Sequence, residues 1–308
     1  MILWTGIGII LAVLVLILTK KVSALTALIV VPLAGGLLAG FGLETADFAV
    51  AGIQKIAPVA AMFIFAILFF GVLTDAGMFD PIIDFILKAV GHHPARITVG
   101  SAILAMIVHL DGSGAVTFLI AIPAMLPLYD QLRMGRRVLA AVVALGAGTM
   151  NLVPWGGPTL RAATALGVEV TDLYNPLLLP QLTGLLFVVA VAWYLGRREG
   201  KRLQLDGTNP HQTVHRRQLS PEELATRRPR LFWFNILLTV ATLTVLISGL
   251  LPPAIVFMLG ATAALVVNYP KLDDQRRRID AHAKASLLMA GILLAAGVFT
   301  GIMQGIPE

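Results

Sequence analysis

Cysteine is absent from the 308 residues of the chain. This absence excludes disulfide-stapled secreted folds, thiolate metal sites and cysteine nucleophiles. Charge is also scarce, because only 13% of the residues are charged, whereas a soluble domain carries about 25%. Hydrophobic residues make up 57%, and the mean hydropathy is +0.86. This composition excludes a water-soluble globule and a disordered chain, and it predicts a polytopic membrane protein.

The charge that is present is mostly basic, with a net value of +6 and a pI near 9.9. In a soluble protein such a balance would suggest nucleic-acid binding. In a membrane chain, Lys and Arg first act as topology signals. We therefore expect the lipid bilayer, and no nucleic acid, as a partner.

Long apolar stretches mark the expected membrane helices, because a spanning helix needs about 20 apolar residues. They are 2–18, 22–42, 58–73, 176–195, 231–248, 253–268 and 285–303. The first lacks the basic start of a cleaved signal peptide, so we interpret it as a retained anchor. The expected fold class is an all-α polytopic membrane protein.

Two further apolar regions are interrupted by polar inserts. Stretches 96–110 and 115–128 are too short to span, and together they predict a re-entrant hairpin, 96–128. Stretches 138–150 and 159–167 predict a broken helix, 138–167.

The basic residues support this arrangement. With the N-terminus outside and 96–128 returning to its own side, all of the 23 Lys and Arg except Lys55 and Arg161 fall on the inner side. Two full crossings at 96–128 would divide them between both sides. The outward loops expected at 43–54 and 168–175 carry acidic residues and no Arg or Lys, apart from Lys55 just beyond the first loop. Cytoplasmic enrichment of Lys and Arg therefore predicts a multi-pass protein of the inner (plasma) membrane.

Two polar segments lie on the expected inner side. In residues 78–90, Asp80, Asp84 and Lys88 recur every fourth residue among apolar positions, which predicts an interfacial helix. The segment 197–230 is basic, and Ser220-Pro221-Glu222-Glu223 predicts a short helix start. His211 and His215 have the spacing of metal ligands on a helix, but their polar neighbours favour a linker.

An internal repeat is suggested by Gly71-Val72-Leu73-Thr74, which matches Gly297-Val298-Phe299-Thr300 at an offset of 226 residues. The same offset relates the first two spans to 231–268. Because the copies start on opposite sides, the pattern predicts an inverted repeat, whose substrate sites lie at the repeat interface. The expected organisation is a first repeat, 1–195, a cytoplasmic linker, 196–230, and a partial second repeat, 231–308.

The two polar inserts are the candidate binding site. Non-helical backbone at membrane depth is tolerated only inside protein or along a wet cavity, and each break exposes a helix N-terminus that attracts anions. Asp111 and Arg161 are costly in a membrane and usually find partners there. Arg161 suits a carboxylate, whereas a structural pairing with Asp111 or a position nearer the outer interface are the alternatives. We expect His109 to be a packed hydrogen-bonding side chain rather than a proton carrier, and Trp155 to wall the site.

The motif HLDGSGAVTFL at 109–119, with TMNLVPWGGPTLRAATALG at 149–167, resembles the citrate–metal–proton symporter family of the ion-transporter superfamily. The resemblance covers nearly the whole chain. It implies two inverted repeats, each with a re-entrant hairpin and a broken helix, in a homodimer that works by an elevator motion. It also implies import of citrate with Mg²⁺ or Ca²⁺, coupled to protons, with no permanently bound cofactor.

Carried over onto this sequence, the resemblance implies a substrate site with no catalytic residue and no protein-bound metal. The site residues are Asp111, Gly112, Ser113, Gly114, Thr117, Asn151, Pro154, Gly156, Gly157, Pro158, Thr159 and Arg161. Members of the family continue into a second hairpin and a second broken helix. We therefore expect the chain ending at Glu308 to be C-terminally incomplete.

Several alternatives stay open from the sequence. Within the same superfamily, the substrate could be another dicarboxylate or arsenite, or the activity could be sodium/proton exchange. An intramembrane enzyme using His109, Asp111 and Ser113 is a different class, although no nucleophile–base spacing supports it. A non-transporting remnant is the third class.

Overall fold

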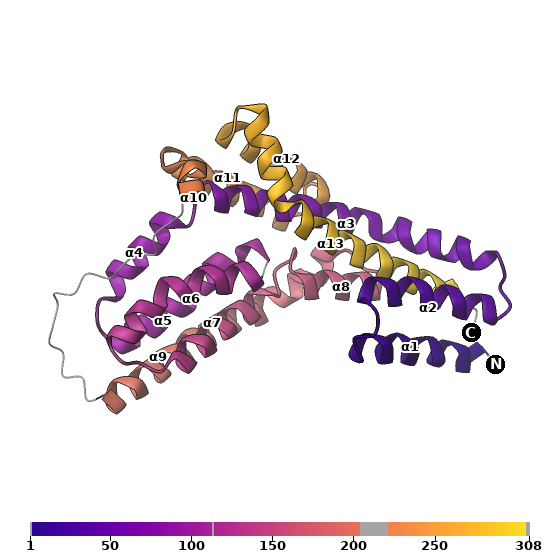
Figure 1. Ribbon diagram of the computed structural model, residues 1–308, viewed down its shortest axis with the longest axis horizontal. Helices are drawn as coiled ribbons and strands as arrows, with labels where there is room; N and C mark the ends of the chain where they lie inside the picture. Colours follow the sequence, from indigo (N-terminus) through magenta and orange to yellow (C-terminus); the bar gives the residue numbers. More distant parts are fainter. Residues whose placement is uncertain (1, 113, 204–220, 306–308) are drawn as a thin grey trace. The chain divides into compact units, whose positions relative to one another are not determined.

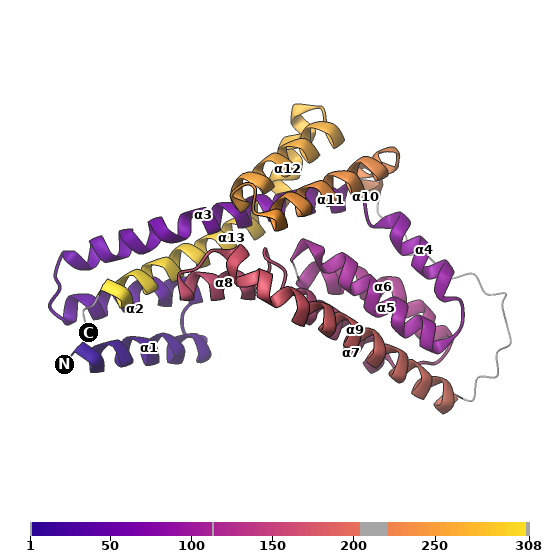
Figure 2. The ribbon, with the colours of Figure 1, turned by 180° about the vertical axis from the view of Figure 1, so that it is seen from behind.

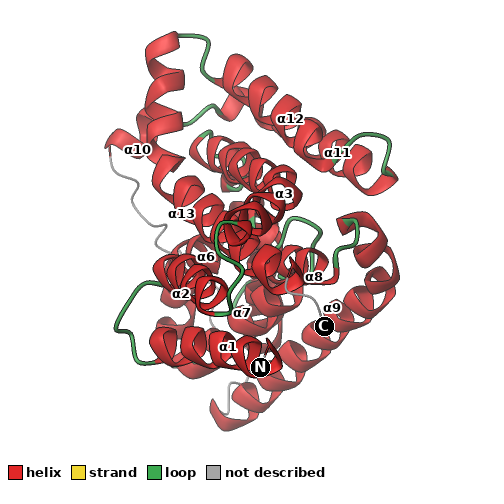
Figure 3. Cartoon of the chain, turned by 90° about the vertical axis from the view of Figure 1, so that its right-hand side faces the viewer, coloured by secondary structure: helices red, strands yellow, loops and turns green. Residues whose placement is uncertain are grey.

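The computed structural model of the protein describes residues 2–112, 114–203 and 221–305 (Figure 1). Within these ranges the chain consists of helices and their connections, with no strand (Figure 3). The helices are α1 (Ile2–Leu18), α2 (Ala24–Leu38), α3 (Glu44–Asp75), α4 (Asp80–Val90), α5 (Pro94–Val108), η1 (His109–Asp111), α6 (Gly114–Gln131), α7 (Arg136–Met150), α8 (Gly157–Leu166), α9 (Val170–Leu203), α10 (Pro221–Thr226), η2 (Pro229–Leu231), α11 (Phe232–Ser248), α12 (Pro253–Asn268) and α13 (Leu272–Gly305). The all-α class is confirmed.

Four of the described helices are long and apolar enough to cross a membrane. They are α3, α9, the stretch Pro229–Ser248 and α13. Shorter apolar helices include α2, α5 and α12. A helix of 15 residues such as α5 extends only about 22 Å, less than the roughly 30 Å of a hydrocarbon core. The first arm of the expected hairpin is therefore a short helix, the second arm, α6, has 18 residues, and the re-entrant path stays a prediction.

Three helices are longer than their apolar stretches, so the loops expected around them are wrong. Helix α3 begins at Glu44 and includes the loop expected at 43–54. Helix α9 begins at Val170 within the loop expected at 168–175, and α13 begins at Leu272. Glu44 and Asp47 lie in the first turn of α3, where acidic side chains interact favourably with the helix dipole. Polar residues thus extend these helices instead of ending them.

The described helices form two compact units. Unit 1 contains residues 1–68, 251–259 and 273–308, and unit 2 contains 69–250 and 260–272. The division passes through α3 and α12. It does not test the repeat boundaries, which are defined along the sequence and stay a prediction.

In unit 1, α3 and α13 approach so closely that only glycine fits between them. A Cβ added at Gly297 would lie 2.9 Å from the carbonyl oxygen of Gly52, and one added at Gly301 would overlap the carbonyl oxygen of Phe48. Gly297, Gly301 and Gly305 recur every fourth residue, so they line one face of α13. Small residues at this spacing let helix backbones pack together in membranes.

In unit 2, α5 is the central helix. It packs against α6, α7 and α9, and α4 packs against its outer side; the four helices α5, α6, α7 and α9 lie side by side in both views (Figure 2). Ten of its 15 residues are buried, among them Ile97, Ala102 and Leu104. This packing holds the two polar inserts, which follow α5 and α7, at neighbouring positions.

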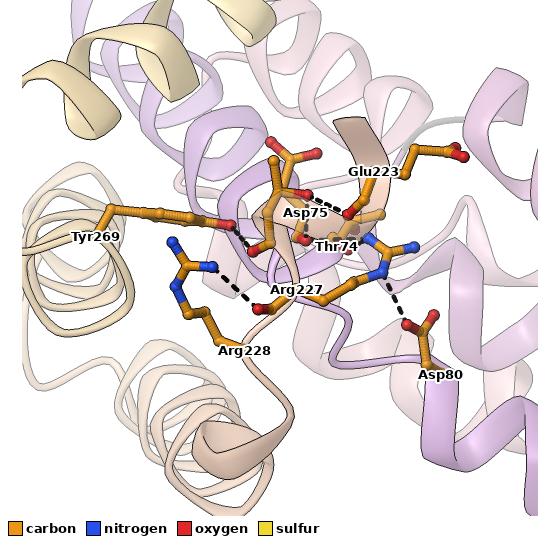
Figure 4. Close-up of polar contacts among 8 residues, drawn as sticks. Thr74, Asp75, Asp80, Glu223, Arg227, Arg228 and Tyr269 are labelled. Carbon is orange, nitrogen blue, oxygen red and sulfur yellow. Dashed lines mark hydrogen bonds and ion pairs between the residues drawn. The ribbon is translucent and has the colours of Figure 1, made fainter. Parts of the chain in front are cut away.

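The residues Thr226–Arg228, here called the strap, cap the C-terminal end of α3 (Figure 4). Arg227 Nη1 donates to the carbonyl oxygens of Thr74 and Asp75, each at 3.0 Å, and its Nε lies 2.8 Å from Asp80 Oδ2. The hydroxyl of Thr226 also donates to the Asp75 carbonyl oxygen. The last carbonyls of a helix have no partner within it and favour a cation. The strap therefore satisfies them from about 150 residues away along the chain.

The other side of the strap contacts the end of α12. Arg228 Nε donates to the carbonyl oxygen of Asn268 at 2.9 Å, and its guanidinium lies 4.8 Å from the ring centre of Tyr269. The Tyr269 hydroxyl donates to the Thr226 carbonyl oxygen at 2.9 Å. Asn268 and Asn235 of α11 exchange two amide hydrogen bonds. The basic residues expected only as inner-face anchors thus also join the ends of α3 and α12. His211 and His215 lie outside the described residues.

Candidate functional site

The first polar insert is a tight turn between α5 and α6. The helix η1 continues α5 to Asp111, and Gly112 then adopts a left-handed conformation with φ +71°. Its N–H donates to the carbonyl oxygen of His109 at 2.9 Å. Glycine takes this conformation without the steric penalty of a Cβ. Gly112 therefore ends the helical stretch of α5 and η1, and the hairpin stays a prediction.

The second insert is a compact loop that depends on Gly156. The Gly156 N–H donates to the Val153 carbonyl oxygen at 2.8 Å, and a Cβ at position 156 would overlap the carbonyl oxygen of Asn151. The hydroxyl of Thr159 donates to the Leu152 carbonyl oxygen at 2.9 Å. These bonds close the loop between the end of α7 at Met150 and the start of α8 at Gly157.

His109 joins the two inserts. Its ring is fully buried. Nδ1 lies 2.7 Å from Thr117 Oγ1, in the opposite arm of the hairpin, and Nε2 lies 3.0 Å from Asn151 Oδ1, in the second insert. One side chain thus contacts both arms of the hairpin and the broken helix. The interpretation of His109 as a packed hydrogen-bonding side chain agrees with this geometry.

Trp155 makes the second link between the inserts. Its Nε1 donates to the carbonyl oxygen of Leu110 at 2.7 Å. Its ring stacks on Phe70 with centroids 5.9 Å apart, and its Cδ1 lies close to the position that a Cβ of Gly112 would take. The indole therefore covers the hairpin turn, a role that is compatible with the expected wall of the site.

The structure brings most of the predicted site residues together, with three qualifications. Gly112, Gly114, Thr117, Asn151, Pro154, Gly156, Gly157, Pro158 and Thr159 all lie in the two inserts or at the starts of α6 and α8. Ser113 lies outside the described residues, and so does the side chain of Asp111. Arg161 is exposed one turn into α8. The described ion pairs do not include Arg161, so the alternative pairing with Asp111 stays a prediction.

Apart from Arg161, the described side chains of the site are neutral. Hydroxyls, one amide and one imidazole supply the polar atoms, and Arg161 is the nearest described cation along α8. In the described ranges, no group of three His, Asp or Glu side chains could hold a metal ion. The hydroxyls, the amide and the imidazole can hydrogen-bond to a polar ligand.

Sequence reasoning missed one support of the second insert. Gln181 of α9 is buried, and its amide nitrogen lies 3.4 Å from the carbonyl oxygen of Thr149 at the end of α7. Its amide oxygen accepts a hydrogen bond of 2.7 Å from the Tyr174 hydroxyl. The sequence signal for this contact is a lone glutamine within the apolar span 176–195. Glutamine side chains in membrane helices form hydrogen bonds to neighbouring helices.

Comparisons with known proteins identify the family. The model of the citrate transporter family matches residues 9–306. A citrate transporter of Bacillus subtilis (strain 168) is 44% identical over 290 residues, which are 94% of this chain and 67% of that protein. From the same strain, a Mg(2+)/citrate complex secondary transporter is 44% identical over 291 residues, which are 94% of this chain and 67% of that protein. A third relative, an uncharacterized transporter, is 38% identical over 299 residues, which are 94% of this chain and 68% of that protein.

The chain thus spans about two thirds of the length of these relatives. Both the family and the relatives carry the names of transporters, so the chain is a multi-pass membrane transporter and the enzyme alternative is wrong. The match over nearly the whole chain and the 44% identity lead to one conclusion. The chain belongs to the citrate transporter family.

Proposed function

We propose that the protein is a secondary active transporter that carries citrate as a complex with Mg²⁺ or Ca²⁺, driven by protons. The observation that carries this proposal is the meeting of the two polar inserts at His109 and Trp155, which gathers neutral hydrogen-bonding groups within one helical unit. The names of two relatives, one of them for a Mg²⁺/citrate complex transporter, support the substrate.

The neutral character of the described site supports a metal complex over free citrate. A citrate trianion would need several cations to offset its charge in a membrane, where uncompensated charge is costly. Binding one divalent cation lowers the net charge of citrate to a single negative charge. Arg161 and the N-terminus of α8 can balance that charge, because the free amides of a helix start attract anions.

The lengths of the helices support the proposed inverted repeat. Helices α1 and α11 have 17 residues each. Helices α2 and α12 have 15 and 16, and α3 and α13 have 32 and 34. Three helices of matching length thus recur in the same order. We propose that residues 1–195 and 231–308 belong to two inverted repeats, in a homodimer of the plasma membrane.

Uptake of labelled citrate tests this function. In cells without citrate uptake of their own, producing the protein that contains this sequence should give citrate accumulation that rises at least about fivefold when Mg²⁺ or Ca²⁺ is added. A protonophore should abolish it, and removal of Na⁺ should not. Citrate uptake that does not depend on Mg²⁺ or Ca²⁺ would contradict the proposed metal complex. Uptake of succinate or arsenite in place of citrate would contradict the proposal and favour another substrate of the superfamily.

A matched pair of variants connects uptake to the site. Asn151→Asp places a carboxylate beside the expected position of the citrate carboxylates, so it should lower uptake more than about tenfold by like-charge repulsion. Asn175→Asp makes the same change at an exposed position of α9, and it should leave uptake unchanged. Equal uptake by the two variants would show that Asn151 does not contribute to the substrate site.

A further inference from the structure

His109 is the buried group that the proposed binding set leaves unused. It follows the last residue of α5, and its two ring nitrogens contact Thr117 of α6 and Asn151 at the end of α7. Three successive helices therefore converge on one imidazole. A buried side chain that contacts two of the proposed binding residues can orient them.

The two contacts define which nitrogen carries the proton. Asn151 presents its amide oxygen to Nε2, and an amide oxygen only accepts hydrogen bonds. In a neutral ring, Nε2 therefore carries the hydrogen. Nδ1 of that neutral ring then accepts from the Thr117 hydroxyl at 2.7 Å. In this arrangement a neutral imidazole has both nitrogens satisfied, and both partners are neutral groups.

The bond from His109 also determines where the amide of Asn151 points. Because its oxygen is held by the ring, its NH₂ group is directed away from the ring. An NH₂ group donates hydrogen bonds and accepts none, so it matches a carboxylate. If the amide were turned over, its oxygen would face the substrate carboxylate and repel it.

We propose that His109 is a positioning residue that, as a neutral ring, holds the Asn151 amide with its donor toward a carboxylate of the substrate. It does not carry the transported proton. The proposal rests on the proposed function, since it assigns His109 a role in binding the citrate complex through Asn151.

Two substitutions separate the two contacts of the ring. In His109→Gln the side-chain amide reaches the position of Nε2 and can still donate to Asn151. In His109→Asn the amide reaches only the position of Nδ1, so the contact with Thr117 is kept and that with Asn151 is lost. We expect KM for Mg²⁺–citrate to change less than about threefold in His109→Gln and to rise at least about tenfold in His109→Asn, because a site that loses an oriented donor loses affinity.

The pH profile of uptake separates positioning from proton transfer. A side-chain amide does not titrate, so His109→Gln should keep the wild-type pH profile and its response to a protonophore. A flattened profile, or uptake that no longer depends on protons, would overturn the proposal. Equal KM values for the two variants, or a His109→Gln chain that does not insert into the membrane, would overturn it as well.

A labelling measurement keeps this test independent of the substrate. Val153 is 3% exposed in the second insert, and the chain has no native cysteine, so Val153→Cys introduces a single buried thiol. N-ethylmaleimide should label it at the same slow rate with His109 and with His109→Gln, and at least about tenfold faster with His109→Asn. If wild-type protein takes up no citrate but this order holds, the proposed function fails, and only the hydrogen bond from His109 to Asn151 is supported. If uptake is normal and the order fails, the positioning role of His109 alone is wrong.

Discussion

Replacing Gly301 by leucine is expected to leave little folded protein in the membrane. The backbones of α3 and α13 meet at this position, where an added Cβ would overlap the carbonyl oxygen of Phe48 and lie 2.8 Å from the Cα of Gly52. These neighbours are backbone atoms, which cannot rotate away as a side chain can. The two helices must therefore separate, at a cost of about 3 kcal/mol, the upper end of the usual cost of overpacking. The measurement is the yield and apparent unfolding temperature of detergent-extracted protein.

Gly8→Leu is the matched control for this substitution. Gly8 lies in α1 of the same unit, and nothing lies within 4 Å of its added Cβ. The change should be neutral or should stabilise α1, because leucine favours helices by about 1 kcal/mol over glycine. Gly301→Ala should fall between the two. An unfolding temperature of Gly301→Leu equal to that of Gly8→Leu would show that the α3–α13 crossing does not depend on glycine.

Arg227→Ala is expected to lower the stability of unit 2 by about 2–4 kcal/mol, because it removes two hydrogen bonds from a charged donor and one ion pair. The side chains of Arg227 and Asp80 are only 19% and 25% exposed, so water replaces their contacts poorly. The carbonyls of Thr74 and Asp75 at the end of α3 would lose their donor. Arg227→Lys keeps the charge but not the planar fork, so it should recover only part of the loss.

An exposed ion pair on α13 provides the control for Arg227. Arg277 pairs with Asp274 at 2.7 Å, with side chains 68% and 29% exposed, and such surface pairs contribute about 0–1 kcal/mol. Arg277→Ala should therefore barely change the unfolding temperature. If Arg227→Ala and Arg277→Ala behaved alike, the strap would be a surface contact and not a cap of α3.

The sequence predicts the helices well where apolar stretches and helix breakers coincide. The expected spans 2–18 and 253–268 match α1 and α12 residue for residue, because Pro253 marks a helix start. Helices α3, α9 and α13 extend beyond their apolar stretches, because polar residues such as Glu44 and Arg276 continue a helix as readily as apolar ones. Hydropathy reports where a helix is apolar, and it does not report where the helix ends.

The candidate site was predictable in position but not in its contacts. Glycine and proline within polar inserts mark the two breaks, and the structure brings the inserts together. The bonds from His109 to Asn151 and from Trp155 to Leu110 join residues more than 40 positions apart, and no local pattern specifies such pairs. The same holds for Arg227, whose partners lie about 150 residues earlier. Tertiary packing decides these contacts, so they require the structure.

Protection of a single thiol tests most directly whether the two inserts form the substrate site. Pro158 is exposed at the start of α8, and Pro158→Cys introduces the only thiol of the chain. Glu169→Cys places the matched control thiol at an exposed position between α8 and α9. If the inserts bind the substrate, Mg²⁺–citrate should slow maleimide labelling at position 158 at least about fivefold and leave position 169 unaffected. Labelling at position 158 that proceeds equally fast with and without Mg²⁺–citrate would contradict the proposed site.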